Sequence, residues 1–123
     1  MLNISKLIKS FGYAFEGIYY SFKNNQNIKI HILAAIVVLV LGLLLKLNEF
    51  EFFAVGVLII LVISAEMINT SIEEVINLLV NEHRLEAKTA KDVSAGMVLL
   101  VAIFAAVVGV FIFVPHFLTL FGF

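Results

Sequence analysis

The sequence lacks cysteine and is poor in charged residues, with a single proline. Without cysteine the chain can form neither disulfides nor thiolate metal sites. Charged residues make up 14% of its 123 positions and hydrophobic residues 63%, whereas a soluble domain carries about a quarter charged residues. The net charge of -1 gives no support for nucleic-acid binding. This composition indicates a protein whose surroundings are lipid rather than water.

The absence of charge is longest at the C-terminal end. Residues Val93–Phe123 contain no Asp, Glu, Lys or Arg over 31 positions, and a bilayer core needs roughly 20. Two earlier uncharged runs, Ile32–Leu45 and Phe52–Ala65, have 14 residues each, a length that also fits a buried soluble helix. Because so short a chain has little polar sequence to cover three such runs, we interpret all three as membrane spans.

The predicted fold is all-α and integral to the membrane, with one domain over residues 1–123. We expect spans at residues 28–47, 50–80 and 92–118, the second continuing beyond the hydrocarbon as a helix. Residues 3–23 place large apolar side chains at helical spacing, which is typical of an amphipathic helix lying on a membrane surface. Residues 81–92 form the strongly polar stretch.

Lysine and arginine are distributed unevenly among the connections. Four lysines precede the first span, and Arg84, Lys88 and Lys91 lie between the second and third. The first connection holds only Lys46, and the C-terminal end has no basic residue. Since basic residues favour the cytoplasmic side, this distribution predicts a cytoplasmic N-terminus and second connection.

A row of polar residues interrupts the apolar pattern in the stretch SAEMINTSIEEVINLL. Glu66, Asn69, Glu73 and Asn77 occupy positions i, i+3, i+7 and i+11, which share one face of a helix. Glu66 and Glu73 are separated by roughly 10 Å along such a helix. A partly desolvated carboxylate at the hydrocarbon edge suits Glu66 to accept a proton from a lipid hydroxyl. Glu73, further out in water, can hold Mg²⁺ together with phosphate oxygens.

Structural explanations compete with these roles. Glu66 could extend to the interface or pair with a lysine, although acids within membrane segments are more often functional. Glu73 could equally be a solvated surface residue, and Lys91 beside Asp92 could be ordinary capping at a helix start. A solvated face is also the simpler explanation for Glu74, Glu82, Glu86 and Lys88. The sequence contains neither GxxxxGK[ST] nor GxGxxG, so a nucleotide would be bound without a glycine loop.

The segment AEMINTSIEEVIN, followed by AKTAKDVSAGMVLL, closely resembles the small integral-membrane prokaryotic diacylglycerol kinases, a family that includes undecaprenol kinases. The family's pattern runs E-x-x-N-[ST]-A-I-E-x-x-x-D and then A-K-D. The stretch FGYAFEGIYYSFKNNQNIKIH is also similar, so the resemblance covers nearly the whole chain. It implies a homotrimer in the bacterial inner membrane, with active sites shared between subunits.

The resemblance implies an ATP-dependent lipid kinase that transfers the γ-phosphate of MgATP to a membrane lipid alcohol at the cytoplasmic face. Glu66 matches the catalytic base, Asn69 the catalytic asparagine beside it, and Glu73 a ligand of the Mg²⁺ bound to ATP. The positions that it implies for nucleotide binding are Lys6, Tyr13, Glu73, Glu82, His83, Arg84, Lys91 and Asp92. The lipid is undecaprenol or diacylglycerol, and the N-x-x-x-H of residues 27–31 favours the undecaprenol kinases.

Two departures leave an alternative open. Asn25 stands where the family has a second metal-binding glutamate, and Asn77 replaces the aspartate of the motif. Asn25 would offer the metal a neutral carbonyl, and Mg²⁺ favours charged oxygen ligands. The alternative is a weak or inactive homologue that binds lipid or nucleotide. A pore lined by Glu66 is disfavoured, because Ile32–Leu45 and Phe52–Ile63 carry almost no polar residue.

Overall fold

The chain folds into four helices with short connections. The computed structural model describes residue 1 and residues 3–123. Its helices are α1 (Ile4–Asn24), α2 (Gln26–Leu44), α3 (Glu49–Leu79) and α4 (Leu85–Leu120). Within these described residues there is no strand, which confirms the all-α prediction.

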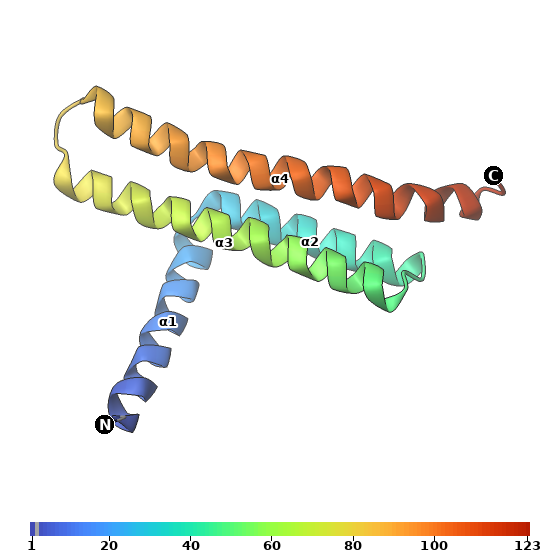
Figure 1. Cartoon of the computed structure of the whole chain (residues 1–123), viewed down its shortest axis with the longest axis horizontal. Coiled ribbons are helices and arrows are strands. Elements are labelled where there is room, and N and C mark those ends of the chain that lie inside the picture. The colour runs from blue at the N-terminus through green and yellow to red at the C-terminus, as the bar shows by residue number, and fades with distance from the viewer. Residues whose placement is uncertain (2) are drawn as a thin grey trace.

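Helix α3 lies between the other two long helices. It packs against α4 along its length and against α2 on another side, while α1 projects away from the bundle (Figure 1). Because α2 begins level with the middle of α3, the last turns of α3 and the first turns of α4 extend past it (Figure 1). At the opposite end of the hairpin His116 Nε2 lies 2.9 Å from Glu51 Oε2, so α3 and α4 are also tied there.

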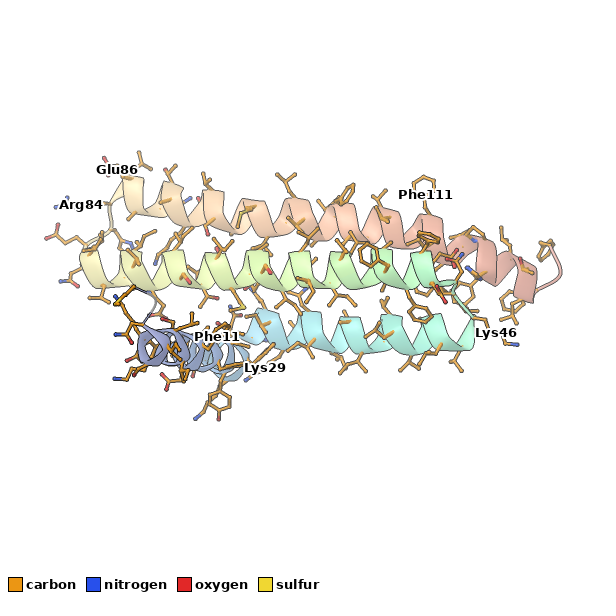
Figure 2. The ribbon with its side chains drawn as sticks, turned by 60° about the horizontal axis from the view of Figure 1, so that its bottom comes forward. Phe11, Lys29, Lys46, Arg84, Glu86 and Phe111 are labelled. Atoms are coloured by element: carbon orange, nitrogen blue, oxygen red, sulfur yellow. The ribbon has the colours of Figure 1, made fainter. Side chains whose placement is uncertain are left out.

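Helices α2, α3 and α4 are each long and apolar enough to cross a membrane. Buried residues make up only 11%, 22% and 6% of their most apolar segments, so most of their large side chains face outward. Figure 2 shows Phe111 pointing away from the bundle, with Arg84 and Glu86 at one end of it and Lys46 at the other. Exposed apolar surface on this scale requires an apolar solvent, which agrees with the three predicted spans.

The connection between α2 and α3 is a tight turn with a cap on each side. Lys46 adopts a left-handed conformation (φ 56°), and the N–H of Leu47 donates to the carbonyl of Gly42 at 3.0 Å. This arrangement satisfies carbonyls at the end of α2. Helix α3 then starts with a capping box between Asn48 and Glu51. The turn therefore fixes α2 antiparallel to α3.

Gly42 allows α2 and α3 to approach closely at this turn. A Cβ added there would lie 3.0 Å from Cε1 of Phe52, so the Phe52 ring would have to move. Since alanine favours a helix over glycine at either position, we expect Gly42→Ala to be less stable than the control variant Gly109→Ala by about 1–3 kcal/mol, the usual cost of overpacking. The thermal midpoint in detergent would show this as a decrease relative to that control. Gly109→Ala is the matched control, because nothing lies within 4 Å of its added methyl; equal midpoints for both variants would contradict the prediction.

Candidate active site

The polar row of α3 begins with a buried carboxylate. Glu66 is 1% exposed, and its Oε1 accepts a hydrogen bond from Nδ2 of Asn25 at 3.0 Å. One turn later Thr70 Oγ1 donates to the backbone carbonyl of Glu66 at 2.9 Å and accepts from the same Asn25 Nδ2 at 2.5 Å. A carboxylate taken out of water needs such a donor, and Asn25 supplies it from the corner between α1 and α2.

Asn25 itself interrupts the helical chain. Its backbone is extended (φ -99°, ψ 118°), which ends α1 and makes Asn25 the N-cap of α2. Its Oδ1 accepts from the N–H groups of Asn27 at 2.8 Å and Ile28 at 3.3 Å. Because only the oxygen of the side-chain amide can accept from backbone N–H groups, the cap directs Oδ1 toward α2 and leaves Nδ2 facing Glu66. This cap conflicts with the expected role of Asn25 as a metal ligand, because the oxygen that would bind the metal already accepts hydrogen bonds from the backbone of α2.

Asn69 and Glu73 form the next part of the row. Asn69 is 4% exposed, and its Nδ2 donates to Glu73 Oε1 at 3.3 Å. Its Oδ1 is buried without a hydrogen-bond partner among the described residues. Because a buried polar atom normally has a partner, this oxygen is available to a water molecule or a ligand. Asn69 and Glu73 thus form one hydrogen-bonded pair on α3, in which the amide N–H group of Asn69 faces the carboxylate.

Ser94 is a polar residue of this region that belongs to no motif in the sequence. It is 4% exposed on α4, and its Oγ also lacks a partner within the described chain. Nearby, Lys91 Nζ donates to Asn77 Oδ1 at 2.6 Å, which sets the level of α4 against α3. Ser94 lies one turn after Lys91, so it is level with the turn of α3 that contains Glu73.

Helix α1 is attached to α3 by a contact at its C-terminal end. Tyr20 Oη donates to Glu74 Oε1 at 3.3 Å. The negative charge of Glu74 and this hydrogen bond raise the pKa of Tyr20 above its ordinary value. Since the raised pKa keeps the phenol protonated, the contact holds at neutral pH and is lost only in strongly alkaline solution.

The connection between α3 and α4 encloses a polar pocket of about 350 Å³. Its lining includes five of the residues expected to bind nucleotide, Glu82, His83, Arg84, Lys91 and Asp92. The pocket also includes Lys88, which forms an ion pair with Asp92. We had expected Lys88 on a solvated face, and it is indeed exposed, but it adds a third cation to the wall beside Arg84 and Lys91. Cations grouped in this way suit a polyphosphate.

Two of the expected nucleotide-binding residues lie elsewhere in the chain. Lys6 and Tyr13 are on the part of α1 that points away from the bundle (Figure 1), and Tyr13 is 68% exposed. Lys6 is 18 residues from the end of α1, which corresponds to about 27 Å of helix. Within one chain these two side chains are therefore not brought to the α3–α4 pocket.

The oxygens present fit Mg²⁺ only as part of a complex with phosphate. No cluster of three or more His, Cys, Asp or Glu able to hold a metal is found among the described residues. Mg²⁺ in phosphate-transferring enzymes is bound by one or two carboxylates plus substrate phosphates. Glu73, a half-buried carboxylate that accepts from Asn69 Nδ2, supplies the one carboxylate of that smaller requirement.

An apolar cavity of about 540 Å³ runs between α2, α3 and α4. Its α4 wall begins with small residues, among them Ala102, Ala105 and Gly109, and ends with larger ones such as Phe113 and Phe117. Its α3 wall reaches Val62 and Ile63, within about one turn of Glu66. The buried carboxylate therefore lies between an apolar cavity and the polar end of the α3–α4 hairpin.

Comparison with known proteins agrees with this arrangement. The sequence profile of the family described as prokaryotic diacylglycerol kinase matches residues 12–113. An undecaprenol kinase of Bacillus subtilis (strain 168) is 35% identical over 112 residues, which is 91% of each chain. A diacylglycerol kinase of Synechocystis sp. (strain ATCC 27184 / PCC 6803 / Kazusa) is 38% identical over 93% of this chain and 66% of its own. The chain belongs to the prokaryotic diacylglycerol kinase family, a family of kinases.

Proposed function

We propose that this protein is a lipid kinase that transfers the γ-phosphate of MgATP to the hydroxyl of a membrane lipid alcohol at the cytoplasmic face. The position of Glu66 is the observation that carries the proposal. This carboxylate is 1% exposed and lies between an apolar cavity and a polar pocket. A base at such a boundary can meet a lipid hydroxyl from one side and a phosphate from the other.

The apolar cavity gives the lipid its place in this proposal. Its walls are apolar except for His31, so an isoprenoid or acyl chain can lie there with its hydroxyl toward the carboxylate. The relatives are named undecaprenol kinase and diacylglycerol kinase, and both names describe kinases of long apolar alcohols. The proposed substrate class is therefore undecaprenol or diacylglycerol.

The polar end of the hairpin receives the nucleotide. Arg84 and Lys91 pair with phosphate charge, while Glu82, His83 and Asp92 line the same pocket. Glu73 would hold the Mg²⁺ of MgATP, and the metal would supply neutralisation of the phosphate charge. Glu66 accepts the proton of the lipid hydroxyl while the hydroxyl oxygen attacks the γ-phosphate in line, and ADP leaves. Positioning and charge neutralisation supply most of the rate in such transfers.

The assembly we propose is the homotrimer implied by the family resemblance, in the bacterial inner membrane with a cytoplasmic N-terminus. Helix α1 lies on the membrane surface, because its large apolar side chains are exposed in the single chain. Since Lys6 and Tyr13 belong to α1, the helix that projects from the bundle (Figure 1), they would serve the nucleotide site of a neighbouring subunit.

Phosphate transfer itself is the test of the proposed function. Purified protein in detergent micelles is given MgATP labelled at the γ-phosphate, with undecaprenol and diacylglycerol in separate reactions. We expect labelled phospholipid from at least one alcohol, and the ratio of the two rates gives the preference. A folded protein that binds MgATP but forms no labelled product would contradict the proposal. That result would support the inactive alternative suggested by Asn25 and Asn77.

A further inference from the structure

We propose that Asn25 is a positioning residue for Glu66 and not a ligand of the metal. The inference rests on the proposed function, in which Glu66 is the base. It concerns the corner between α1 and α2, where Asn25 contacts two different helices through opposite ends of one amide. The positioning role explains why an asparagine occupies this corner.

Every hydrogen-bonding group of the Asn25 amide is used. An asparagine side chain has two N–H donors and an oxygen with two lone pairs. The two donors go to Glu66 Oε1 and Thr70 Oγ1, at 3.0 and 2.5 Å. The oxygen accepts from the N–H groups of Asn27 and Ile28. No lone pair remains for a cation unless the cap of α2 is broken.

The identity of the residue follows from this double duty. An aspartate could cap α2 equally well, but it has no donor and would place a second negative charge against Glu66. A serine could also cap the helix, but its side chain ends at Oγ and offers Glu66 no amide donor. Asparagine alone among the good N-cap residues combines the cap oxygen with N–H donors at the same reach.

The contact also orients the carboxylate. Asn25 holds Oε1 of Glu66, and Thr70 is fixed beside it by its bond to the Glu66 carbonyl. With one oxygen held, the carboxylate cannot rotate freely, and the other oxygen is left for the substrate proton. General-base catalysis depends on such alignment. Losing the donor should therefore lower kcat while leaving substrate binding nearly unchanged.

Asn25→Asp distinguishes the two roles because they predict opposite results. If Asn25 positions Glu66, kcat falls by about tenfold or more, because a carboxylate at this half-buried position repels the buried carboxylate of Glu66. The KM for MgATP and the Mg²⁺ concentration giving half-maximal rate then stay within about twofold. If Asn25 is a metal ligand, the new carboxylate binds Mg²⁺ better, so less Mg²⁺ is needed and kcat is kept or raised. That outcome would overturn the inference.

Asn25→Ser separates the positioning role from the cap, and it also covers the case in which Asn25→Asp does not fold. The cap of α2 should be kept, since serine and asparagine are similar caps, but the thermal midpoint should fall by about 5 °C or more because the buried Glu66 carboxylate loses its donor. Its kcat should still fall by about tenfold with KM unchanged. A serine variant with parental kcat would refute the positioning role.

Asn24→Asp is the matched control, with the same chemical change one residue earlier. Asn24 is exposed, and its Nδ2 donates only within α1, to the carbonyl of Tyr20 at 3.0 Å. Its kcat should remain within about twofold of the parent, because Asn24 does not touch Glu66. The parent protein keeps the two hypotheses separable: absence of transfer in the parent refutes the proposed function, whereas parental rates in the Asn25 variants refute only the positioning role.

Discussion

Glu66→Gln is expected to lower the rate of phosphate transfer by about 10²–10⁴-fold, the contribution usual for a general base. The substitution keeps the size and shape of the side chain and removes its ability to accept the substrate proton. Folding should survive, because a glutamine oxygen can still accept the hydrogen bond from Asn25 Nδ2. Labelled phosphate transfer at saturating MgATP and lipid measures the effect on kcat, and the thermal midpoint checks the fold.

A matched control for this variant is Glu86→Gln. Glu86 is an exposed acid in the first turn of α4, so the same loss of charge there should leave kcat within about twofold of the parent. Near-parental transfer by Glu66→Gln would remove Glu66 from the role of base. A loss of activity in both variants would point to net charge rather than to the site.

Glu73→Gln is expected to raise the Mg²⁺ concentration needed for half-maximal rate by about 10–100-fold. The estimate follows from losing one interaction with a charged partner, worth about 1.5–3 kcal/mol, at about 1.4 kcal/mol per tenfold. Glutamine keeps an oxygen for the metal and can still accept from Asn69 Nδ2, so the loss is electrostatic. Titrating Mg²⁺ at fixed ATP measures the shift.

The neighbouring acid provides the comparison for Glu73. Glu74 faces α1 and accepts from Tyr20 Oη, so Glu74→Gln should leave the Mg²⁺ requirement within about twofold of the parent. An unchanged requirement in Glu73→Gln would show that this carboxylate is not a metal ligand. A shift in Glu74→Gln alone would place the metal on the α1 side of α3.

The helices could be predicted because their causes are local. Long uncharged runs define three apolar helices, and the sequence predicted one long middle helix over residues 50–80, where α3 spans Glu49–Leu79. Burial of Glu66 and Asn69 at 1% and 4% exposed agrees with the polar face inferred from spacing. The roles assigned to these side chains stay predictions, because they depend on bound substrates.

The corner at Asn25 could not be derived from the sequence. Asn25 and Glu66 are 41 residues apart, and only the packing of α2 on α3 brings them together. Because the family has a metal-binding glutamate at this position, the resemblance suggested that the carbonyl oxygen of Asn25 binds the metal. In the structure that oxygen caps α2. The stretch NNQN, residues 24–27, contained the available signal, since asparagine is a preferred N-cap.

The sequence analysis missed Lys88 and Ser94 as site residues, because their surroundings depend on how α4 packs against α3. Lys88 looked like part of a solvated face and lines the pocket at the α3–α4 connection. Ser94 carries no motif, and its unpartnered hydroxyl is visible only once α4 is packed on α3. Conversely, Lys6 and Tyr13 were expected at the site, and a single chain leaves them on the projecting part of α1.

Because α3 is one unbroken helix, it fixes the distance along its axis between Glu66 and Glu73. The two carboxylates lie on the same helix, roughly 10 Å apart along its axis. For the proposed reaction, a lipid would be chosen by how deep its hydroxyl lies below the phosphates, and less by the shape around that hydroxyl. Lipids as unlike as a polyisoprenol and a glyceride could then both be substrates, because each can place its hydroxyl at the required depth. An alcohol whose hydroxyl lies a few ångströms too shallow would not be phosphorylated.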